Sequence, residues 1–230
     1  GEKDLNDRLE LDNVSIVIWT TTPWTLPANL GISLHADYDY GVYKTEKGNL
    51  LLAKELAETA FAEMEIEKYE LIKEVKGSEL DNVHYKHPFI DRTGLVMLGE
   101  HVTLEAGTGA VHTAPAYGKE DYLQGLKDKL GMVVAVDDKG KQTAEAGEFA
   151  GQFYAKSNKT ITAWLDENGY LLKAVKIEHS YPHDWRTKKP IIFRATKQWF
   201  CSIDKIRDEL LNELENNVKF HTEWGKKRLY

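Results

Sequence analysis

The sequence predicts a mainly β domain with inserted helices, an α+β or barrel-centred fold, on three observations. Many short runs rich in β-branched and aromatic residues are separated by Gly, Pro and Asp, as strands separated by turns are. A few runs instead show the three-to-four-residue apolar spacing of helices. These runs do not alternate regularly with the strand-like runs, which argues against a parallel βαβ series.

The expected strands begin with Val14–Thr22, whose β-branched and aromatic residues suit a strand buried on both faces. Pro23 stops it. A hairpin is expected next, because Tyr38–Thr45 and Gly48–Leu52 flank a turn made of Glu46, Lys47 and Gly48. Three further strands are expected at Glu70–Lys76, Leu95–Leu98 and Val133–Val136.

Four apolar patterns predict helices, in chain order Leu51–Glu65, Lys119–Leu130, Ser157–Asn168 and Ile203–Asn217. The second helix would end at Gly131 and direct four side chains inward, Tyr122, Leu123, Leu126 and Leu130. The third would begin at a cap formed by Ser157 or Asn158 and bury Ile161, Trp164 and Leu165.

The domain organisation predicted from these patterns has three parts. Residues 1–13 are polar and are expected to be a linker, and residues 14–200 are expected to form one domain. Residues 201–230 carry a strongly amphipathic helix without obvious partners and a basic end, KKRLY. Such a helix suggests that the chain has been cut from a larger protein.

The composition is that of an acidic globular chain. Its 230 residues hold 30 Lys and Arg against 37 Asp and Glu, a formal charge of −7, and one cysteine. A single cysteine excludes a disulfide scaffold and the Cys-rich zinc sites. The sequence lacks an apolar run near the roughly 20 residues that cross a bilayer, and its start is charged, so a cytoplasmic protein without membrane contact is expected.

The charge also bears on the partner, because phosphate binding depends on Lys and Arg. A net charge of −7 argues at first sight against nucleic acid, but residues 171–200 hold seven basic and two acidic residues, a local net of +5. Charge alone favours reading that stretch as ordinary solvated surface.

Two histidine pairs have ligand-like spacing, His84 with His87 and His179 with His183. Neither has a third Cys, His or carboxylate in a recognisable arrangement, so neither a metal nor a cofactor is expected. The sequence also has no phosphate-binding loop, zincin helix or nucleophile elbow.

The segment Trp19–Asn29 reads WTTTPWTLPAN. The two prolines remove backbone donors and fix φ, so this segment is expected to leave the sheet as a rigid loop that presents hydroxyls and an indole. Clustered hydroxyls can hold a water molecule or a substrate oxygen. They are poor nucleophiles without an adjacent base, and the sequence places none beside them.

The segment Gly107–Asp121 reads GTGAVHTAPAYGKED. It lacks the third glycine of a dinucleotide fingerprint, because His112 stands there. Its small residues at 107–110 would let the backbone approach a ligand closely. His112 and Asp121 bracket a turn, although an acid in the first turn of a helix and a lone buried histidine are both common without function.

Together the two segments resemble the editing domain, the insertion called connective peptide 1, of the isoleucyl-tRNA synthetases. The segment at 181–200, YPHDWRTKKPIIFRATKQWF, resembles the return of that insertion toward the catalytic core. The resemblance runs from about Val14 to Ile203 and makes 14–200 the editing domain. It implies a closed β-barrel core of the valyl, isoleucyl and leucyl editing-domain type. Neither HIGH nor KMSKS occurs, so amino-acid activation is not expected.

The activity that the resemblance implies is hydrolysis of valine misattached to tRNA(Ile), and of valyl-adenylate. Valine lacks one methylene of isoleucine, a difference worth only about 1–3 kcal/mol in an apolar pocket, for which isoleucyl-tRNA synthetase is itself the usual example. A second pocket that admits valine and rejects isoleucine would supply the missing selectivity. The alternative is a binding module for the tRNA 3′ end that is inactive without the rest of the synthetase.

The resemblance also implies roles for single residues. Asp121 would pair with the α-ammonium of the substrate, which lowers its pKa and keeps it charged. The hydroxyls of Thr20, Thr21 and Thr22 would orient the attacking water and the ester. His112 would line the pocket as a size gate. Three further residues would bind the substrate: Trp24 and Asn29 at the terminal adenosine, and Gly109 in the close-approach turn.

Two departures from the family pattern concern positions 117 and 184. Many relatives have a second histidine where this chain has Tyr117, and a cysteine where it has Asp184. The general base is left open, with a ribose hydroxyl of the tRNA end as one candidate. The expected partners are the valine-carrying 3′ end of tRNA(Ile), valyl-adenylate and the rest of the parent synthetase, with the chain itself a monomer.

Overall fold

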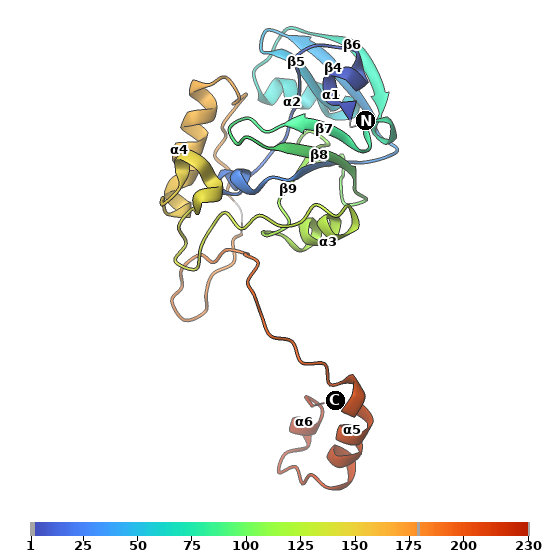
Figure 1. Cartoon of the computed structure of the whole chain (residues 1–230), viewed down its shortest axis with the longest axis vertical. Coiled ribbons are helices and arrows are strands. Elements are labelled where there is room, and N and C mark those ends of the chain that lie inside the picture. The colour runs from blue at the N-terminus through green and yellow to red at the C-terminus, as the bar shows by residue number, and fades with distance from the viewer. Residues whose placement is uncertain (1–2, 179, 230) are drawn as a thin grey trace. The chain divides into compact units, whose positions relative to one another are not determined.

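The computed structural model describes residues 3–178 and 180–229 (Figure 1). It divides the chain into two compact units, Gly1–Ala195 and Thr196–Tyr230. The first unit contains the sheets and the helices around them. The second contains a 3-10 turn, Asp204–Ile206, and the helices α5 (Arg207–Asn216) and α6 (Glu223–Lys226).

One sheet of the first unit has five strands, and its order is β1-β7-β8-β3-β9. The strands are β1 (Lys3–Asp4), β7 (Val83–Lys86), β8 (Thr93–Leu98), β3 (Gly31–Leu34) and β9 (Val111–Thr113). β3 pairs in parallel with β8 and antiparallel with β9, where Ile32 lies opposite His112. This pairing fixes the position of His112.

The other sheet has four strands in the order β2-β5-β4-β6. They are β2 (Val14–Ile16), β5 (Gly48–Ala53), β4 (Asp39–Thr45) and β6 (Tyr69–Lys76). The predicted hairpin and the strand after it are therefore confirmed. The first predicted strand is shorter than expected, because only Val14–Ile16 joins the ladder. The chain then turns away into the segment Trp19–Asn29, called the Thr-Pro loop below.

The core lies between the two sheets. Ile32 and Val96 from the first sheet and Val42 and Leu51 from the second belong to one buried cluster. The alternate residues of β5, Leu50 and Leu52, pack on the opposite face against α2 (Ala57–Glu63). β5 is thus the strand with two buried faces, which follows from the period of two along a strand.

The closed barrel expected from the resemblance is not formed among the described residues. The strands make two open sheets, each with two edges. The edge strands β1 and β9 have only two and three residues, which is too short to continue the hydrogen-bond ladder around a barrel. The broader prediction, a mixed fold with helices inserted among short strands, agrees with the structure.

Two predicted elements differ because β-pairing overrides the local pattern. The helix expected at Leu51–Glu65 begins only at Ala57, since Leu51–Ala53 pairs with β4 and a 3-10 turn, Lys54–Leu56, follows. The strand expected at Val133–Val136 does not form. Only Val136 pairs there, in an isolated bridge with Gln142.

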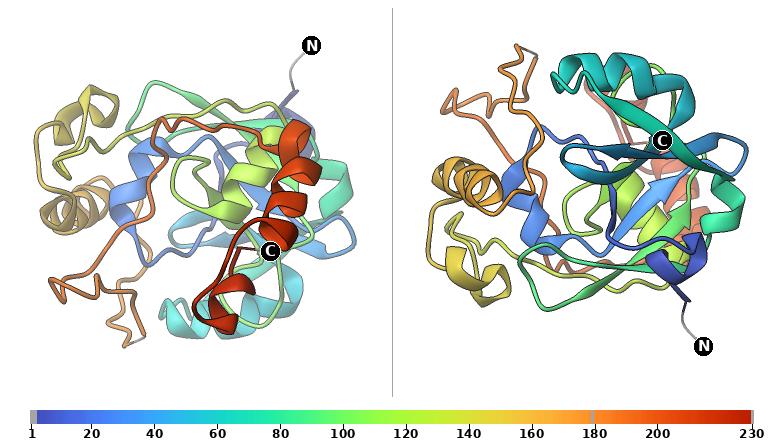
Figure 2. Two further views of the ribbon diagram at one scale, coloured as in Figure 1. Left: turned by 90° about the horizontal axis from the view of Figure 1, so that it is seen from below. Right: turned by 90° about the horizontal axis from the view of Figure 1, so that it is seen from above.

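The helix α4 (Tyr154–Glu167) begins earlier than predicted. Ser157 and Asn158 lie inside it and do not cap it, and Ser157 Oγ donates to the carbonyl of Tyr154. Figure 2 shows α4 beside the 3-10 turn Pro23–Ala28. Ile161 and Leu26 share a buried cluster there, so α4 supports the Thr-Pro loop from outside.

The helix α3 (Lys119–Lys127) exposes to solvent the face that was expected to be buried. Tyr122, Leu123 and Leu126 are all more than 40% exposed, and Gln124 and Gly125 are buried instead. Gln124 Nε2 donates to the carbonyl of Leu98. This polar contact docks the helix, and it cannot be read from apolar spacing.

The start of the chain is not a linker over its described part. Leu5 and Leu9 of α1 (Leu5–Leu9) are buried in the main core, and the side chain of Asp4 caps the helix by accepting from Asn6 N at 2.9 Å. The five-residue helix is too short to give a clear periodic signal. The boundary between the two units lies at Ala195, close to the predicted end of the domain at residue 200.

Candidate functional site

A cavity of about 370 Å³ lies between the Thr-Pro loop, the turn before β9 and the start of α3. Six of the eight predicted site residues line it, namely Thr20, Thr21, Thr22, Gly109, His112 and Asp121. Segments about 90 residues apart in the sequence therefore meet here. Trp24 and Asn29 do not line the cavity.

The turn at Gly107–Ala110 forms the floor of the cavity and is tied to the four-stranded sheet. Ala53 N donates to the carbonyl of Thr108 at 2.8 Å, and Thr108 Oγ1 donates to the carbonyl of Val17 at 2.6 Å. Gly109 has φ +71°, and a Cβ there would lie 2.4 Å from the Cβ of Ala53. Glycine is therefore required for the backbone conformation and for the close packing.

The threonine hydroxyls form a short chain along one wall. Thr22 N donates to Thr20 Oγ1 at 3.0 Å, and the Oγ1 atoms of Thr20 and Thr22 are 3.4 Å apart. Thr22 Oγ1 is 3.3 Å from Thr25 Oγ1, which donates to the carbonyl of Thr22 at 2.8 Å. Thr21 is exposed toward the cavity.

His112 is held in one tautomer. Its Nδ1 lies 2.8 Å from Asn29 Nδ2, an atom that can only donate, so Nδ1 accepts and Nε2 carries the proton. Nε2 then donates to Thr25 Oγ1 at 3.0 Å. Burial lowers the pKa of His112 to about 4, with a smaller contribution from His87. The imidazole is therefore neutral at pH 7 and both ring nitrogens are occupied.

Asn29 is buried behind His112 and not exposed to a ligand. Its amide also donates to the carbonyl of Gly31 at 2.9 Å, and its carbonyl oxygen accepts from the hydroxyl of Tyr85. Burial raises the pKa of Tyr85. The contact of Asn29 with adenosine stays a prediction, and in this structure the side-chain amide of Asn29 orients His112.

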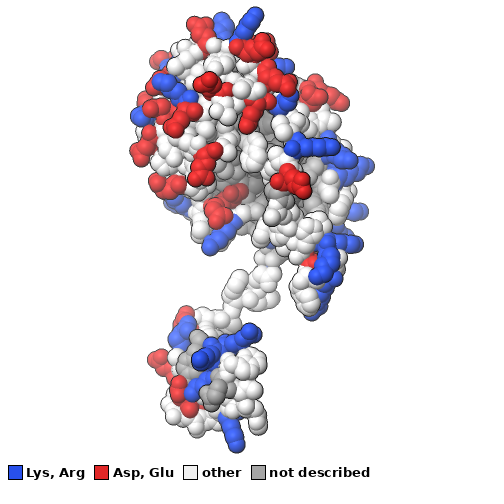
Figure 3. All heavy atoms as spheres, turned by 180° about the vertical axis from the view of Figure 1, so that it is seen from behind, with Lys and Arg blue, Asp and Glu red and all other residues white. Residues whose placement is uncertain are grey.

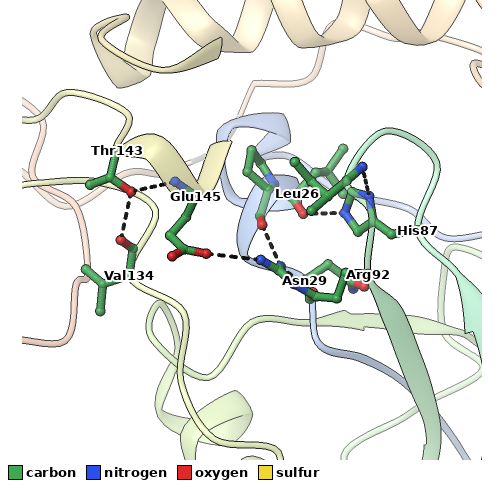
Figure 4. A network of polar contacts seen from close by, with 9 residues as sticks. Leu26, Asn29, His87, Arg92, Val134, Thr143 and Glu145 are labelled. Carbon is green, nitrogen blue, oxygen red and sulfur yellow. Dashed lines mark hydrogen bonds and ion pairs between the residues drawn. The ribbon is translucent and has the colours of Figure 1, made fainter. Parts of the chain in front are cut away.

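A network of polar contacts holds the far side of the Thr-Pro loop (Figure 4). Arg92 Nη1 donates to the carbonyls of Pro27 and Asn29 at 2.8 and 3.2 Å, and its Nη2 pairs with Glu145 at 3.4 Å. His87 Nε2 donates to the carbonyl of Leu26 at 2.9 Å. These bonds satisfy carbonyls that the prolines leave without a regular ladder.

Trp24 is a buried support for the loop. Its backbone N donates to Asn158 Oδ1 at 2.9 Å, and its ring meets Tyr117 edge-on at a centroid distance of 5.1 Å. It is only 4% exposed, so the predicted contact with adenosine is not available to it. Tyr117 lines the cavity, and its hydroxyl accepts from Val136 N at 2.8 Å.

Asp121 lies in the first turn of α3, as predicted, and its Oδ2 accepts from Ala114 N at 2.9 Å. Burial raises the pKa of this carboxyl, while the bond from Ala114 and the nearby His101 act in the opposite direction. The direction of this shift is opposite to the lowering expected for a carboxylate paired with a cation.

The structure brings four further residues to the site that sequence reasoning missed. Trp19, His101 and Tyr117 line the cavity, and Thr25 bonds to His112. Trp19 is 57% exposed, a fraction that leaves its indole open to a ligand. Trp19 and Thr25 belong to the segment already singled out, but only tertiary packing distinguishes the exposed Trp19 from the buried Trp24.

The described residues contain no cluster of three or more His, Cys, Asp or Glu side chains that could hold a metal ion. His87 uses both ring nitrogens, because Nδ1 accepts from Ile90 N at 3.1 Å while Nε2 donates to Leu26. His179 lies outside the described residues. Among the described helices, none has the length and the hydropathy that a membrane-spanning helix needs.

The charges are unevenly distributed over the first unit. On the face in Figure 3, acidic side chains are spread over the part that contains the sheets, while Lys and Arg gather along the edge formed by α4 and the segment that follows it. The basic stretch at 171–200 belongs to the first unit as far as residue 195. This part of the stretch contributes to the basic edge.

The sequence comparisons define the class of the protein. A family model described as "tRNA synthetases class I (I, L, M and V)" matches residues 38–230, and the chain therefore belongs to that family. Among its members the chain is similar to isoleucine-tRNA ligases. It is 55% identical over 228 residues to that of Bacillus mycoides strain KBAB4, and 54% identical to that of Bacillus cytotoxicus strain DSM 22905.

Each of these matches covers 99% of the chain but only 24% of the relative, so the chain spans about a quarter of the length of the curated relatives it matches. Solved structures support the fold. The chain resembles one titled "The crystal structure of GlLeuRS-CP1", with a TM-score of 0.59, 17% identity, and coverage of 74% of this chain and 88% of that one.

A second similar structure is the cytosolic leucyl-tRNA synthetase editing domain of P. knowlesi, with a TM-score of 0.55 and 10% identity. It covers 68% of this chain and 83% of that one. At these identities the likeness concerns the fold, which is that of synthetase editing domains.

Proposed function

We propose that the chain is the hydrolytic editing domain of an isoleucyl-tRNA synthetase, which deacylates tRNA(Ile) carrying valine, hydrolyses valyl-adenylate and excludes isoleucine. The observation that carries the proposal is the single cavity in which Asp121, His112 and the hydroxyls of Thr20 to Thr22 meet. These groups can bind a cation, limit the size of a side chain and hold a water molecule at one place.

Asp121 binds the α-ammonium group of the aminoacyl ester in this proposal. The bound cation favours the charged carboxylate and so counteracts the burial that raises the pKa of Asp121. The bond from Ala114 N holds the carboxylate in place. Asp121 thereby positions the ester and does not itself remove a proton.

The hydroxyls of Thr20 and Thr22 orient the attacking water and the ester carbonyl. Their Oγ1 atoms are 3.4 Å apart, close enough for both to contact one small molecule. His112 is not the base, because Nδ1, the ring nitrogen with a free lone pair, already accepts from Asn29 and Nε2 carries a proton. In deacylation the proton of the attacking water passes instead through the neighbouring ribose hydroxyl of the tRNA end to the ester oxygen that departs, and the reaction uses neither a metal nor a cofactor.

His112 sets the size of the amino-acid pocket. A rigid ring excludes a larger side chain better than a mobile one, and His112 is fixed on both sides by Asn29 and Thr25. One methylene distinguishes isoleucine from valine, so a small displacement of this ring would change the specificity.

The terminal adenosine lies against Trp19. An exposed aromatic ring at the rim of a cavity is suited to stacking on a base, and Trp19 has the exposure that Trp24 lacks. The turn at Gly109 lets the ligand approach the backbone closely. The basic edge of the first unit faces the anionic tRNA. The body of the tRNA is held mainly by the rest of the parent enzyme. The chain is monomeric and acts in the cytoplasm.

The test is to incubate the purified chain with Val-tRNA(Ile) and Ile-tRNA(Ile) and to follow the release of each amino acid. The proposal predicts release of valine and retention of isoleucine. If the chain binds the tRNA end but releases neither, the alternative of a binding module that needs the remaining three quarters of the synthetase is favoured. Equal release of both amino acids would exclude the size gate.

A further inference from the structure

Two backbone N–H groups in the floor of the cavity have no hydrogen-bond partner within the described part of the chain. They belong to Gly109 and Ala110, two buried residues that line the cavity. More than about 90% of buried backbone N–H groups in folded proteins are paired. Two neighbouring unpaired donors at the wall of a cavity therefore call for an explanation.

The directions of these two N–H groups follow from the carbonyls that precede them. The carbonyl of Thr108 accepts from Ala53 N at 2.8 Å, and that of Gly109 accepts from the hydroxyl of Tyr40 at 2.7 Å. Ala53 and Tyr40 do not line the cavity, so both carbonyls point away from it. Both peptides are trans, and in a trans peptide the N–H points opposite to the C=O. The N–H groups of Gly109 and Ala110 therefore point toward the cavity.

The anchors of the turn fix these donors before any ligand binds. The hydroxyl of Tyr40 accepts from His35 N at 3.0 Å and donates its own proton to Gly109. Burial raises the pKa of Tyr40 to about 12, so the hydroxyl keeps that proton at pH 7. A turn that directs successive N–H groups to one side is suited to binding an anion. Donors that are already in place stabilise a developing charge without the cost of reorganisation.

We propose that the N–H groups of Gly109 and Ala110 form an oxyanion hole, which stabilises the negative charge that develops on the carbonyl oxygen of the aminoacyl ester during hydrolysis. The inference rests on the proposed function for the identity of the ester. When water attacks, its oxygen bonds to the carbonyl carbon and the π electron pair of the carbonyl moves onto the carbonyl oxygen. That oxygen stays negative until the C=O bond re-forms and the bond to the ribose oxygen breaks. The departing ribose oxygen takes up the proton that the water has lost.

The threonine wall lies beside this floor, as the reaction requires. Thr108 Oγ1 bonds to the carbonyl of Val17 at 2.6 Å, and a Cβ on Gly107 would lie 3.7 Å from the Cβ of Trp19. The start of the Thr-Pro loop therefore touches the turn. An ester held between wall and floor presents its carbon to a water molecule on the threonine hydroxyls and its oxygen to the two N–H groups.

The test replaces one amide by an ester, because this change removes the N–H and keeps the side chain. Lactate in place of Ala110, introduced by nonsense suppression, removes one donor, and glycolate in place of Gly109 removes the other. Lactate in place of Ala144 is the matched control. The N–H of Ala144 also has no hydrogen-bond partner in the described part of the chain, and the carbonyl before it, that of Thr143, accepts one bond, from Ala146 N.

The first measurement is the kinetics of deacylation of Val-tRNA(Ile) by the full chain. An oxyanion hole acts on the transition state, so lactate at position 110 should lower kcat about 100-fold and leave KM unchanged. Glycolate at position 109 should do the same. Lactate at position 144 should leave both constants unchanged.

The second measurement is the binding of two adenosine probes, by calorimetry. In one, valine is joined to the ribose through an amide, so the reacting carbon is planar and the group is neutral. In the other, the phosphonic acid analogue of valine is joined as a monoester, which is tetrahedral and anionic. Lactate at position 110 should weaken binding of the phosphonate probe about 100-fold and leave binding of the amide probe unchanged.

A side-chain variant tests the same donors if an ester variant does not fold. Tyr40 is a positioning residue, because its hydroxyl anchors the carbonyl of Gly109. Tyr40→Phe should lower kcat and the affinity for the phosphonate probe about tenfold, with KM and the amide probe unchanged. Tyr43→Phe, on the same strand, is the control, because the hydroxyl of Tyr43 has no hydrogen-bond partner among the described residues. Unchanged kcat in the ester variants, or equal loss of both probes, would overturn the inference.

The two proposals fail in different ways. If lactate at position 110 weakens only the phosphonate probe and yet the unchanged chain releases no valine from tRNA, the anion site stands and the hydrolytic function does not. If the unchanged chain releases valine and both ester variants release it at the same rate, the function stands and the oxyanion hole does not.

Discussion

The side-chain amide of Asn29 donates a 2.8 Å hydrogen bond to Nδ1 of His112. This bond determines which ring nitrogen of His112 carries the proton. The protonated nitrogen is Nε2, which donates to Thr25 Oγ1 on the opposite side of the ring. His112 is therefore a neutral ring whose orientation is fixed by its neighbours, and Asn29 acts on the cavity through it.

Asn29→Asp should change the state of His112. A carboxylate can only accept, so Nδ1 must become protonated, and the nearby anion should raise the pKa of His112 above about 4. We expect deacylation to fall by about tenfold or more, because the displaced ring misplaces the ester. Nitrogen-15 spectra of the imidazole against pH measure the change. Asn168→Asp, on the exposed end of α4, is the control, and an unaltered His112 titration would contradict the assignment.

Asp121→Asn should abolish deacylation while the fold is retained, because the amide oxygen can still accept from Ala114 N but carries no charge for the ammonium group. Asp121→Ala should do the same. Burial raises the pKa of Asp121, so its charged form costs stability at pH 7, and the Asn variant should melt at the same or a higher temperature. Glu120→Gln, on the exposed neighbour, is the control. Normal deacylation by either Asp121 variant would refute the role.

His112→Ala should admit isoleucine. Removing the ring leaves space for at least one methylene, so the chain should release isoleucine from Ile-tRNA(Ile) at a rate approaching that for valine. The ratio of the two release rates measures the effect. His183→Ala, at an exposed histidine, should leave the ratio unchanged, and continued retention of isoleucine by His112→Ala would remove this residue from the size gate.

Stability should fall as the pH decreases from about 6.5 to about 4. Burial lowers the pKa of both His87 and His112 to about 4, so in this window the unfolded chain binds more protons than the folded chain. The stabilisation is complete above the unfolded value and is lost on acidification, by up to about 3 kcal/mol for each ring. Urea unfolding at pH 7 and pH 5 measures it. His87→Gln should flatten the dependence, and His183→Gln should not.

Gly109→Ala should destabilise the chain more than Gly151→Ala. Both glycines have positive φ, +71° and +80°, so both variants carry the same backbone strain of roughly 1 kcal/mol. Only at Gly109 does the new Cβ meet another atom, the Cβ of Ala53 at 2.4 Å, whereas nothing lies within 4 Å at Gly151. The difference in unfolding free energy between the variants isolates that clash, and equal values would show that the floor can move.

Local sequence predicts those parts of the fold that depend on near neighbours. The hairpin of β4 and β5 and the strand β6 follow from runs of strand-forming residues and from the turn residues between them. The buried start at Leu5 and Leu9 and the short edge strands depend on contacts with distant segments, which propensity does not contain. For the same reason the barrel implied by the resemblance gives way to two open sheets.

The candidate site, like the fold, has features that the sequence predicts and features that depend on contacts between distant segments. The resemblance carried by the two segments predicts six residues that line the cavity. The two segments do not distinguish Trp19 from Trp24, since which indole faces inward depends on packing against Tyr117 and Tyr154. Asn29 likewise reaches His112 only when β3 and β9 are brought together.

The floor of the cavity is also a part of the core. The amide of Ala53, at the end of β5, donates to the carbonyl of Thr108, and Tyr40 of β4 donates to the carbonyl of Gly109 at 2.7 Å. The floor can therefore yield only if the end of the central hairpin separates. Any adaptation to the shape of a ligand has to come from the rim, where Trp19 and Thr21 are exposed, so the cavity has one rigid wall and one adjustable wall.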